Sequence, residues 1–359
     1  MPVRTLVIAY PSNPNLRSEK CSPIPHFLTN FAAPDLTSVF QNLTIPRATP
    51  KTLHMQCPKR EHLQCLEQLT HRQLLHGGWP FHSSAAQAAV EPTALALLAL
   101  PSNLVRERDR AIRFLLRIQN SNGSWPAFPG DDPEGSGFTG LAVYALHRSG
   151  VKGTATDRAI RWLMQSRGWE SHWLWKWKFR TTDRHVRFNP DKFGWPWMPK
   201  TVSWVVPTAY SLLALRQVHG GSQQDLLQFR MRRGVEMLYD RICPEGGWNA
   251  GNGVVYGSAL APHPDATAVA LLALFGEPLN DFTTASLDWL ERRAESLHAL
   301  WSLAWTILAL HAYHRPIQPL IDNLRAVVEP LEINDCATLA LVCLALHCAG
   351  GPNVFGVNA

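Results

Sequence analysis

Two kinds of helical pattern alternate along most of the chain. Six charged segments carry apolar residues three and four positions apart: 61–75, 105–118, 155–165, 226–241, 284–296 and 319–328. Each precedes an Ala- and Leu-rich phrase that is apolar on every side, beginning at Thr93, Thr139, Thr208, Thr267, Leu303 or Leu339. The first pattern predicts a helix with one face in water, and the second predicts a buried helix. The chain therefore alternates outer with inner helices.

A repeated phrase fixes the period of this alternation. The pattern Gln-x3-Gly-x-Trp occurs at 73–79 and again at 119–125. The two copies lie 46 residues apart, and 46 residues also separate Thr93 from Thr139. Two independent markers with one period indicate a structural repeat of about one helix pair.

Six helix pairs suffice to close a ring, in which every inner helix is buried between two neighbours. We therefore predict an all-α fold, an (α/α)6 toroid over residues 59–359 with an insertion at 169–204. An open solenoid is the alternative, but its exposed ends would need polar capping repeats, and the apolar tail 350–357 favours closure. Residues 1–58 are rich in proline and lack the pattern, which predicts an irregular N-terminal arm.

Composition narrows the class of protein. With 46% hydrophobic and 17% charged residues, the 359-residue chain is of the globular type. Its seven cysteines form no C-x-x-C pair, so we expect buried thiols, a reducing compartment, no metal and no cofactor. Without a recognisable signal peptide or membrane span, we expect a cytoplasmic protein, with contact to a membrane surface left open. Nucleotide-binding and esterase motifs do not occur.

The repeat resembles a known family. The Gln-x3-Gly-x-Trp phrases look like the QW repeats of squalene–hopene and oxidosqualene cyclases. The Thr-Ala-x-x-Leu-Leu-Ala-Leu phrase is similar to the inner helices of those cyclases and of protein prenyltransferase β subunits. Over roughly residues 60–350, the resemblance implies a toroid acting on or binding an isoprenoid in an apolar central cavity, as a class II terpene cyclase (an isomerase). It also implies a structural role for Gln73, Trp79, Gln119 and Trp125, to which Trp248 is added as a degenerate copy.

The catalytic acid of the cyclases belongs to an Asp-x-Asp-Asp-Thr-Ala motif, matched here by residues 263–268. The resemblance implies Asp265 as the acid, tuned by His263, although two of the three carboxylates are missing. Asp265 also suits the cap of a helix start. The Asp-x-Cys zinc pair of the prenyltransferases is not matched, because Asp335 and Cys336 are adjacent and would point about 100° apart on a helix.

A second carboxylate occupies the equivalent place in another repeat. Glu91 precedes Thr93 by two residues, as Asp265 precedes Thr267. Both would lie at the same end of the ring, where two carboxylates facing each other suit acid–base work such as glycoside hydrolysis. The alternative is that each simply stabilises the positive end of its helix dipole.

The insertion at 169–204 is rich in tryptophan and holds seven Lys and Arg against three acids. If extended, its alternation would put aromatic residues on one face and cations on the other. The candidates for substrate contact, besides Glu91, are Trp175, Trp177, Arg180, Trp195, Trp197 and Trp204. The insertion could cover the cavity and bind an anion, rest on a membrane, stack nucleic acid, or merely pack on the ring; the small net charge of +6 disfavours nucleic acid.

Two hypotheses of different class follow. In the first, the chain is a cyclase-like enzyme whose partner is an isoprenoid or another apolar small molecule. In the second, it is a non-catalytic scaffold that binds a lipid or a partner protein. A second subunit is compatible with either hypothesis.

Overall fold

The computed structural model describes residues 60–181, 188–218, 223–328 and 332–356, so the predicted arm 1–58 lies outside the described residues. Thirteen α-helices and one two-stranded hairpin make up the described part. The hairpin pairs β1 (Val254–Val255) with β2 (Ser258–Ala259) in antiparallel register. No helix among these residues combines the length and hydropathy needed to cross a bilayer.

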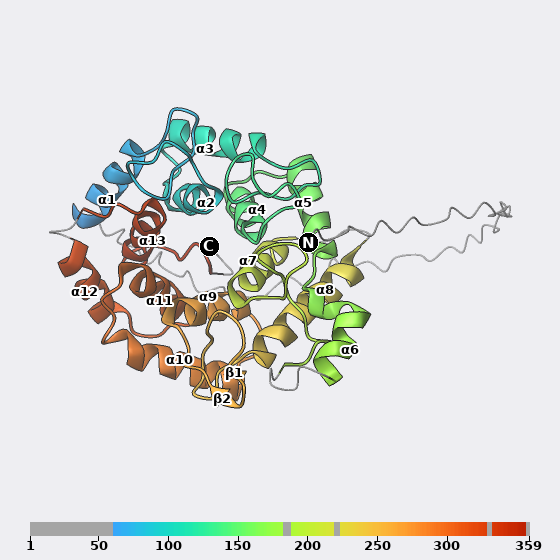
Figure 1. Cartoon of the computed structure of the whole chain (residues 1–359). Helices are drawn as coiled ribbons and strands as arrows, with labels where there is room; N and C mark the ends of the chain where they lie inside the picture. Colours follow the sequence, from blue (N-terminus) through green and yellow to red (C-terminus); the bar gives the residue numbers. More distant parts are fainter. Residues whose placement is uncertain (1–59, 182–187, 219–222, 329–331, 357–359) are drawn as a thin grey trace, which may run out of the picture. The chain divides into compact units, whose positions relative to one another are not determined.

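The helices form two concentric layers (Figure 1). The outer layer consists of α1 (Arg60–His71), α3 (Val105–Arg117), α5 (Thr154–Gln165), α8 (Gln224–Asp240), α10 (Asp281–Ala294) and α12 (Gln318–Val328). The inner layer consists of α2 (Val90–Ala99), α4 (Phe138–Arg148), α7 (Val205–Leu215), α9 (Pro264–Leu274), α11 (Leu300–Ala312) and α13 (Cys336–His347). Each inner helix packs against the next, and α13 packs against α2, which closes the ring. The predicted (α/α)6 toroid is confirmed.

A tryptophan joins the outer to the inner helix in four of the repeats. The indole of Trp79 donates a hydrogen bond to the carbonyl of Leu69 on α1 (2.7 Å), and its backbone N–H donates to Thr93 Oγ1 on α2 (2.9 Å). The same two bonds recur at Trp125, Trp195 and Trp248, with Thr139, Thr208 and Thr267 as their acceptors on the inner helices. The threonine that begins each of these phrases therefore recurs because its hydroxyl accepts a hydrogen bond from the backbone N–H of the tryptophan.

The glutamines of the repeat join one helix pair to the next. Gln73 Nε2 donates to the carbonyls of Gly77 and of Glu107 on α3, both at 2.9 Å. Gly77 has a φ of +100°, and any side chain there would collide with the backbone of Arg110. Gln119 makes the equivalent bonds, one of them to Ala155 on α5. The glutamine of each of these two repeats thus links one helix pair to the next outer helix.

The interior of the ring is occupied by large aromatic side chains. Tyr144, Tyr210 and Trp305 point inward from α4, α7 and α11 and are fully buried. Phe355, from the tail after α13, stacks on Tyr144 (ring centroids 5.4 Å apart) and lies 5.3 Å from Trp305. Asn353 fixes this tail by donating to the carbonyl of Leu308 (2.7 Å). The expectation of an open apolar cavity at the centre is therefore wrong, because aromatic side chains and the tail fill it.

The insertion contains a helix, so the two-faced arrangement that an extended chain would give does not occur there. It contains a short 3-10 turn, η1 (Trp169–Ser171), and α6 (Trp173–Thr181). On a helix, residues two apart point to opposite sides. Trp175 therefore faces the protein, whereas Trp177 is exposed.

Candidate functional site

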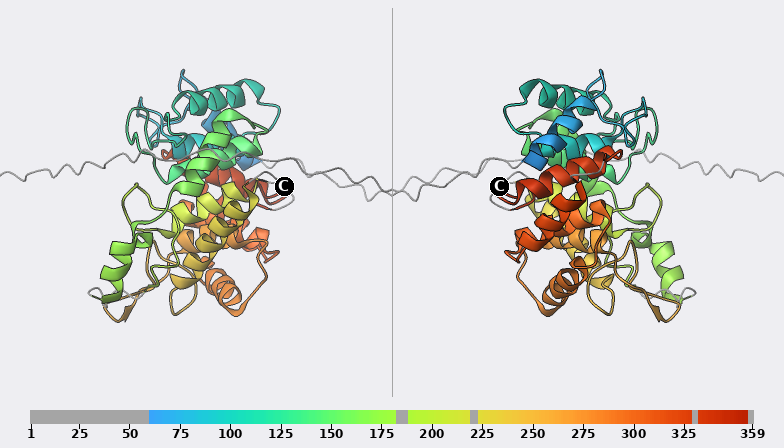
Figure 2. Two further views of the ribbon diagram at one scale, coloured as in Figure 1. Left: turned by 90° about the vertical axis from the view of Figure 1, so that its right-hand side faces the viewer. Right: turned by 90° about the vertical axis from the view of Figure 1, so that its left-hand side faces the viewer.

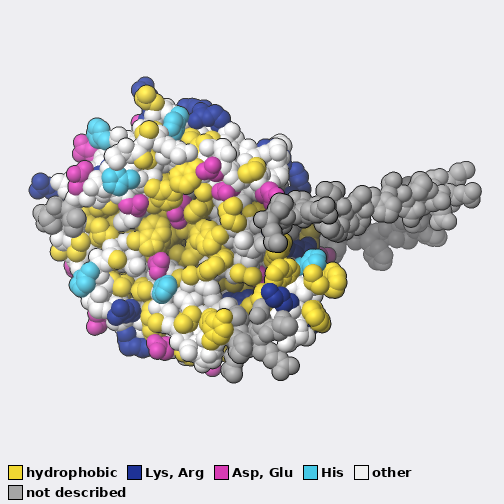
Figure 3. Space-filling model, in the orientation of Figure 1, with side chains coloured by type: hydrophobic (Ala, Val, Ile, Leu, Met, Phe, Trp, Pro, Cys, Tyr) yellow, Lys and Arg dark blue, Asp and Glu magenta, His cyan; other side chains and the backbone are white. Residues whose placement is uncertain are grey.

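Three acidic residues gather where the inner helices begin, a face that we call the N-terminal mouth. Glu91 and Asp265 lie in the first turns of α2 and α9, and Asp335 is the N-cap of α13. Figure 3 looks onto this face: apolar side chains gather at its centre with acidic ones among and around them, and most Lys and Arg lie farther out. The mouth therefore combines an apolar floor with carboxyl groups.

Glu91 has the most perturbed carboxyl group of the mouth. Burial, with a smaller contribution from the nearby charge of Asp335, raises the pKa of Glu91 to about 7. The hydroxyl of Tyr210, on α7, donates a hydrogen bond to Glu91 Oε1 (3.3 Å) and opposes this rise. The desolvation cost outweighs both the hydrogen bond and the helix dipole, which favour the charged form. A carboxyl with this pKa is partly protonated at neutral pH and is suited to give up a proton.

Asp265 lies across the mouth from Glu91. The order around the ring is α2, α4, α7, α9, α11 and α13, which places α9 opposite α2. Burial raises the pKa of Tyr210 well above its usual range, and the charges of Glu91 and Asp265 both add to this rise, so the tyrosine lies close to the two carboxyl groups. The N-cap of α9 is His263, and the described residues offer the carboxylate of Asp265 no hydrogen-bond partner. Asp265 is thus not the capping group.

Asp335 has a structural explanation of its own. Its Oδ1 accepts a hydrogen bond from the backbone N–H of Thr338 (2.6 Å), which caps α13. Backbone bonds from Ser83 to Asn334 and from Cys336 to Phe81 hold this cap beside the segment that leads into α2. Asp335 therefore acts on the site through its charge near Glu91.

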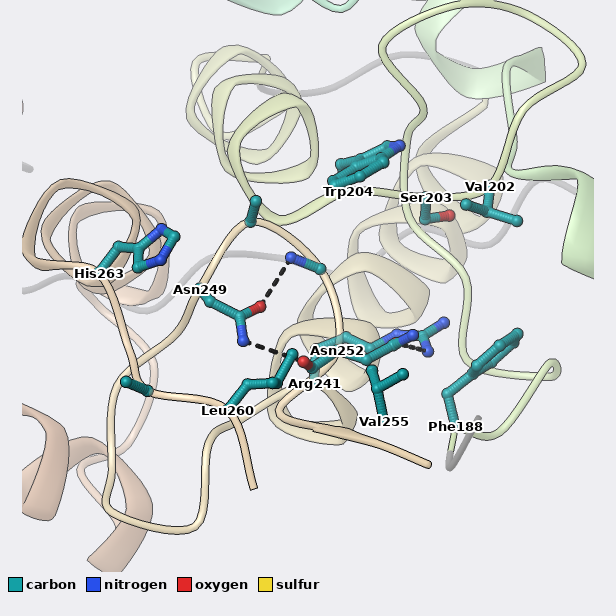
Figure 4. Close-up of a pocket in the computed structure, with 13 residues that line it drawn as sticks. Phe188, Val202, Ser203, Trp204, Arg241, Asn249, Asn252, Val255, Leu260 and His263 are labelled. Carbon is teal, nitrogen blue, oxygen red and sulfur yellow. Dashed lines mark hydrogen bonds between the residues drawn. The ribbon is translucent and has the colours of Figure 1, made fainter. Parts of the chain in front are cut away.

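A pocket of about 470 Å³ adjoins the mouth, beside the starts of α7 and α9. We call it the Trp204 pocket; its lining residues are Phe188, Val202, Ser203, Trp204, Arg241, Asn249, Ala250, Gly251, Asn252, Val255, Leu260, Ala261 and His263. Figure 4 shows Trp204, His263 and Phe188 around the pocket, with Arg241 and Asn252 joined between them. The lining is mainly apolar, with amide groups at one end.

Arg241 is the charged residue that lines this pocket, and a buried acid lies beside it. Arg241 is buried and lies 3.9 Å from the carboxylate of Glu170, which is also fully buried. The Arg241 guanidinium donates to Asn252 Oδ1 and stacks 3.8 Å above the ring of Phe188. Burial lowers the pKa of Arg241 to about 10, against the opposing effect of Glu170, so it stays charged at neutral pH. Asp240 Oδ2 lies 4.0 Å from Arg241 Nε as a second acidic partner, so the charge of Arg241 is compensated within the protein and is not left for an anionic ligand.

The structure separates the predicted site residues into three groups and two single tryptophans. Glu91 and Asp265 lie at the mouth, His263 and Trp204 line the pocket, and Trp175, Trp177 and Arg180 lie on α6. Trp197 packs against Phe138 at the start of α4, with ring centroids 5.1 Å apart. Trp195 is one of the four repeat tryptophans, and Arg230 covers its ring at 3.4 Å. Trp195 is 1% exposed and has no surface left for a substrate.

Sequence reasoning missed the groups that complete the site: Tyr210, Arg241, Asn249 and Asn252. Tyr210 carried a signal, because it replaces the aliphatic residue that follows Thr-Ala or Thr-Gly in the phrases at Thr93, Thr139 and Thr267. The other three lie in or beside a loop with no repeat to compare. No group of His, Cys, Asp or Glu suited to a metal ion occurs within the described ranges.

Comparisons with known proteins support the fold. Neither a protein-family model nor a curated protein sequence matches the chain. An alpha-amylase from Clostridium perfringens aligns with a TM-score of 0.55 at 9% identity, covering 85% of this chain and 99% of that protein. A glycosidase in complex with glucose aligns with a TM-score of 0.54 at 11% identity, covering 81% and 97%. A type II terpene cyclase from Scytonema aligns with a TM-score of 0.34 at 15% identity, covering 81% and 96%.

These comparisons correct the functional prediction. The toroid inferred from the resemblance is confirmed, but the structural neighbours support the fold alone and not a squalene–hopene cyclase in particular. The expected isoprenoid cyclase or lipid-binding scaffold is contradicted by neighbours that are an alpha-amylase and a glycosidase. The expected apolar partner is contradicted in the same way. The physical reason lies in the interior of the ring, where buried aromatic side chains occupy the place that a long hydrocarbon chain would need.

Proposed function

We propose that the chain is an enzyme that cleaves glycosidic bonds at the N-terminal mouth. Glu91 is the general acid and Asp265 the general base. The observation that carries the proposal is the carboxyl group of Glu91, whose pKa is raised to about 7 opposite a second carboxyl group. Glycoside hydrolysis requires such a pair, one member protonated and the other not.

The positions of the two residues favour inversion of configuration at the anomeric carbon. Neighbouring helix axes lie about 8–10 Å apart, so opposite helices of a six-membered ring lie roughly 16–20 Å apart. A Glu and an Asp side chain bridge only part of that distance. Inverting enzymes separate their carboxyl groups by about 6.5–9.5 Å to admit a water molecule, whereas retaining enzymes need only about 5 Å.

Each bond change has an assigned residue. Glu91 donates its proton to the glycosidic oxygen as the bond from this oxygen to the anomeric carbon breaks. Asp265 accepts a proton from a water molecule, whose oxygen attacks the anomeric carbon from the opposite face. Tyr210 holds the acid in place through its hydrogen bond to Glu91 Oε1.

The remaining features support a neutral sugar as substrate. Sugars present polar hydroxyls at their edges and apolar C–H groups on their faces. The Trp204 pocket offers a matching combination of aromatic side chains, amide groups and an arginine, Arg241, whose charge is compensated by nearby acids. It adjoins the start of α9, so it would hold a sugar residue on the Asp265 side of the cleaved bond. The alpha-amylase and the glycosidase with bound glucose support the same class of substrate.

The test is hydrolysis of a panel of neutral oligosaccharides and aryl glycosides by the purified full-length chain. We expect at least one substrate to be cleaved, with inversion of the anomeric configuration seen by ¹H NMR at early times. Glu91→Gln and Asp265→Asn should each abolish most of this activity. Glu67→Gln and Asp281→Asn, the same changes at exposed positions on outer helices, should leave it unchanged. No cleavage of any substrate, or full activity in both mouth variants, would refute the proposal.

A further inference from the structure

Helix α6 exposes two tryptophan side chains on its outer face. Trp173 is 72% exposed and Trp177 is 62% exposed. Residues four apart lie on the same face of a helix, about 6 Å along its axis. Large apolar groups that gather on a surface mark interaction sites. The two tryptophans are therefore a candidate binding surface.

The inner face of α6 packs on other residues of the insertion. Trp175 stacks on Trp169 (ring centroids 5.3 Å apart), and Phe179 meets Phe188 edge-on at 4.8 Å. Phe188 in turn lies against Arg241 in the Trp204 pocket. The inner aromatic residues anchor the helix, so the outer two are not needed to hold it.

Two of the cations on α6 are engaged within the protein. Lys176 forms an ion pair with Asp191 (2.8 Å), and Arg180 donates to the other oxygen of the same carboxylate. A single carboxylate thus engages two of the cations on the helix. An anionic surface would compete with this network, whereas a neutral ligand leaves it intact.

We propose that Trp173 and Trp177 bind a neutral polysaccharide, with one sugar ring stacked on each indole. The proposal rests on the proposed function and narrows its substrate to a polymer. Figure 2 shows α6 projecting on the same side of the ring as the loops that lead into the inner helices. A chain held on α6 therefore approaches the mouth from the side of the Trp204 pocket.

The experiment measures binding separately from cleavage. The full-length Glu91→Gln protein, which keeps the proposed binding surface, is incubated with insoluble cellulose, xylan, chitin or starch granules, and the bound fraction is measured after sedimentation. We expect retention on at least one polymer and at least ten-fold weaker binding when Trp173→Ser and Trp177→Ser are added. Phe282→Ser, which removes an aromatic residue 57% exposed on α10, is the matched control and should bind normally.

Each other outcome is decisive. Unchanged binding by the double tryptophan variant, retention on no polymer, or binding only to phospholipid vesicles run in parallel would overturn this inference. The proposed function fails separately, if the wild-type chain cleaves no soluble oligosaccharide although it binds the polymer. If the double variant still cleaves short oligosaccharides but not the polymer, both proposals stand.

Discussion

The two mouths of the ring are built from the same inner helices but differ in what covers them. At the C-terminal ends, the tail closes the ring: Asn353 bonds to α11, the Tyr144 hydroxyl donates to the carbonyl of Val354 (2.7 Å), and Phe355 is buried. At the N-terminal ends, Glu91 is held by a single tyrosine, and among the described residues Asp265 makes no hydrogen bond. The tail thus covers one mouth, whereas the other mouth carries carboxyl groups that the described residues hold by few hydrogen bonds.

The difference between the two mouths indicates which positions of the repeat hold the ring together and which do not. The tryptophan and glutamine bonds that hold the ring lie in the connections from outer to inner helices. At the starts of the inner helices the recurring threonine takes part in these bonds, whereas Glu91 and Asp265, two residues before it, do not. Partial positive charge at helix N-termini also favours acidic side chains there. The N-terminal mouth is therefore the end at which chemistry can develop.

The largest expected effect concerns the two carboxyl groups. With an oligosaccharide, Glu91→Gln should lower kcat by about 10²–10⁴, the usual contribution of a general acid. With an aryl glycoside whose leaving group is a weakly basic phenolate, the loss should be much smaller, because that oxygen departs without a proton. Asp265→Asn should slow both substrates equally. A Glu91→Gln variant equally slow on both substrates would contradict the assignment of the acid.

The next effect concerns the closed mouth. Phe355→Ala should lower the free energy of unfolding by about 3–5 kcal/mol, because a buried aromatic ring leaves a cavity between Tyr144 and Trp305. Activity of the folded protein should change little. Urea titration followed by circular dichroism measures the change, with the exposed Phe282→Ala as the control. A loss below about 1 kcal/mol would show that the tail does not close the ring.

The third effect is the pH dependence of the free energy of unfolding, which depends on the ionisation of Glu91 at the N-terminal mouth. The pKa of Glu91 is raised in the folded protein to about 7, so its proton is lost less readily there than in the unfolded chain. Glu91 therefore costs stability progressively as pH rises from about 4.5 to 7, and nothing below that range. The free energy of unfolding of Glu91→Gln should exceed that of the wild type by about 1–3 kcal/mol at pH 8 and should equal it at pH 4. Thermal unfolding at both pH values measures this, and a pH-independent difference would refute it.

The smallest effect isolates Asp335, which caps α13 and adds charge near Glu91. Asp335→Asn should retain the cap, whereas Asp335→Ala should cost about 1 kcal/mol of stability. Both variants should lower the pKa of Glu91, shifting the alkaline limb of the pH–rate profile to lower pH. An unchanged limb in both variants would show that Asp335 does not act on Glu91.

The fold could be predicted to a large extent because the repeat is local. The outer and inner segments were bounded to within a few residues, and the paired spacing of Trp79 and Thr93 turned out to be a hydrogen bond. The insertion was harder, since alternation of Trp and Lys has two interpretations until the chain is known to be helical. Of the candidate site, Asp265 was named from the resemblance to the cyclase motif, and Glu91 from its equivalent position in another repeat. Arg241 was not, because its partner Glu170 is distant in sequence.

The sequence by itself determined the helix pairs, their number and the end of the ring at which Glu91 and Asp265 lie, because these follow from periodicity and from residues that bond within one repeat. Only the tertiary structure decided that aromatic side chains and the tail fill the centre, that Tyr210 reaches Glu91, and that Trp173 and Trp177 face outward. Each of these depends on residues from different helices meeting inside or outside a closed ring. Burial is a property of that assembled ring, and it is burial that moves the pKa of Glu91 toward neutrality.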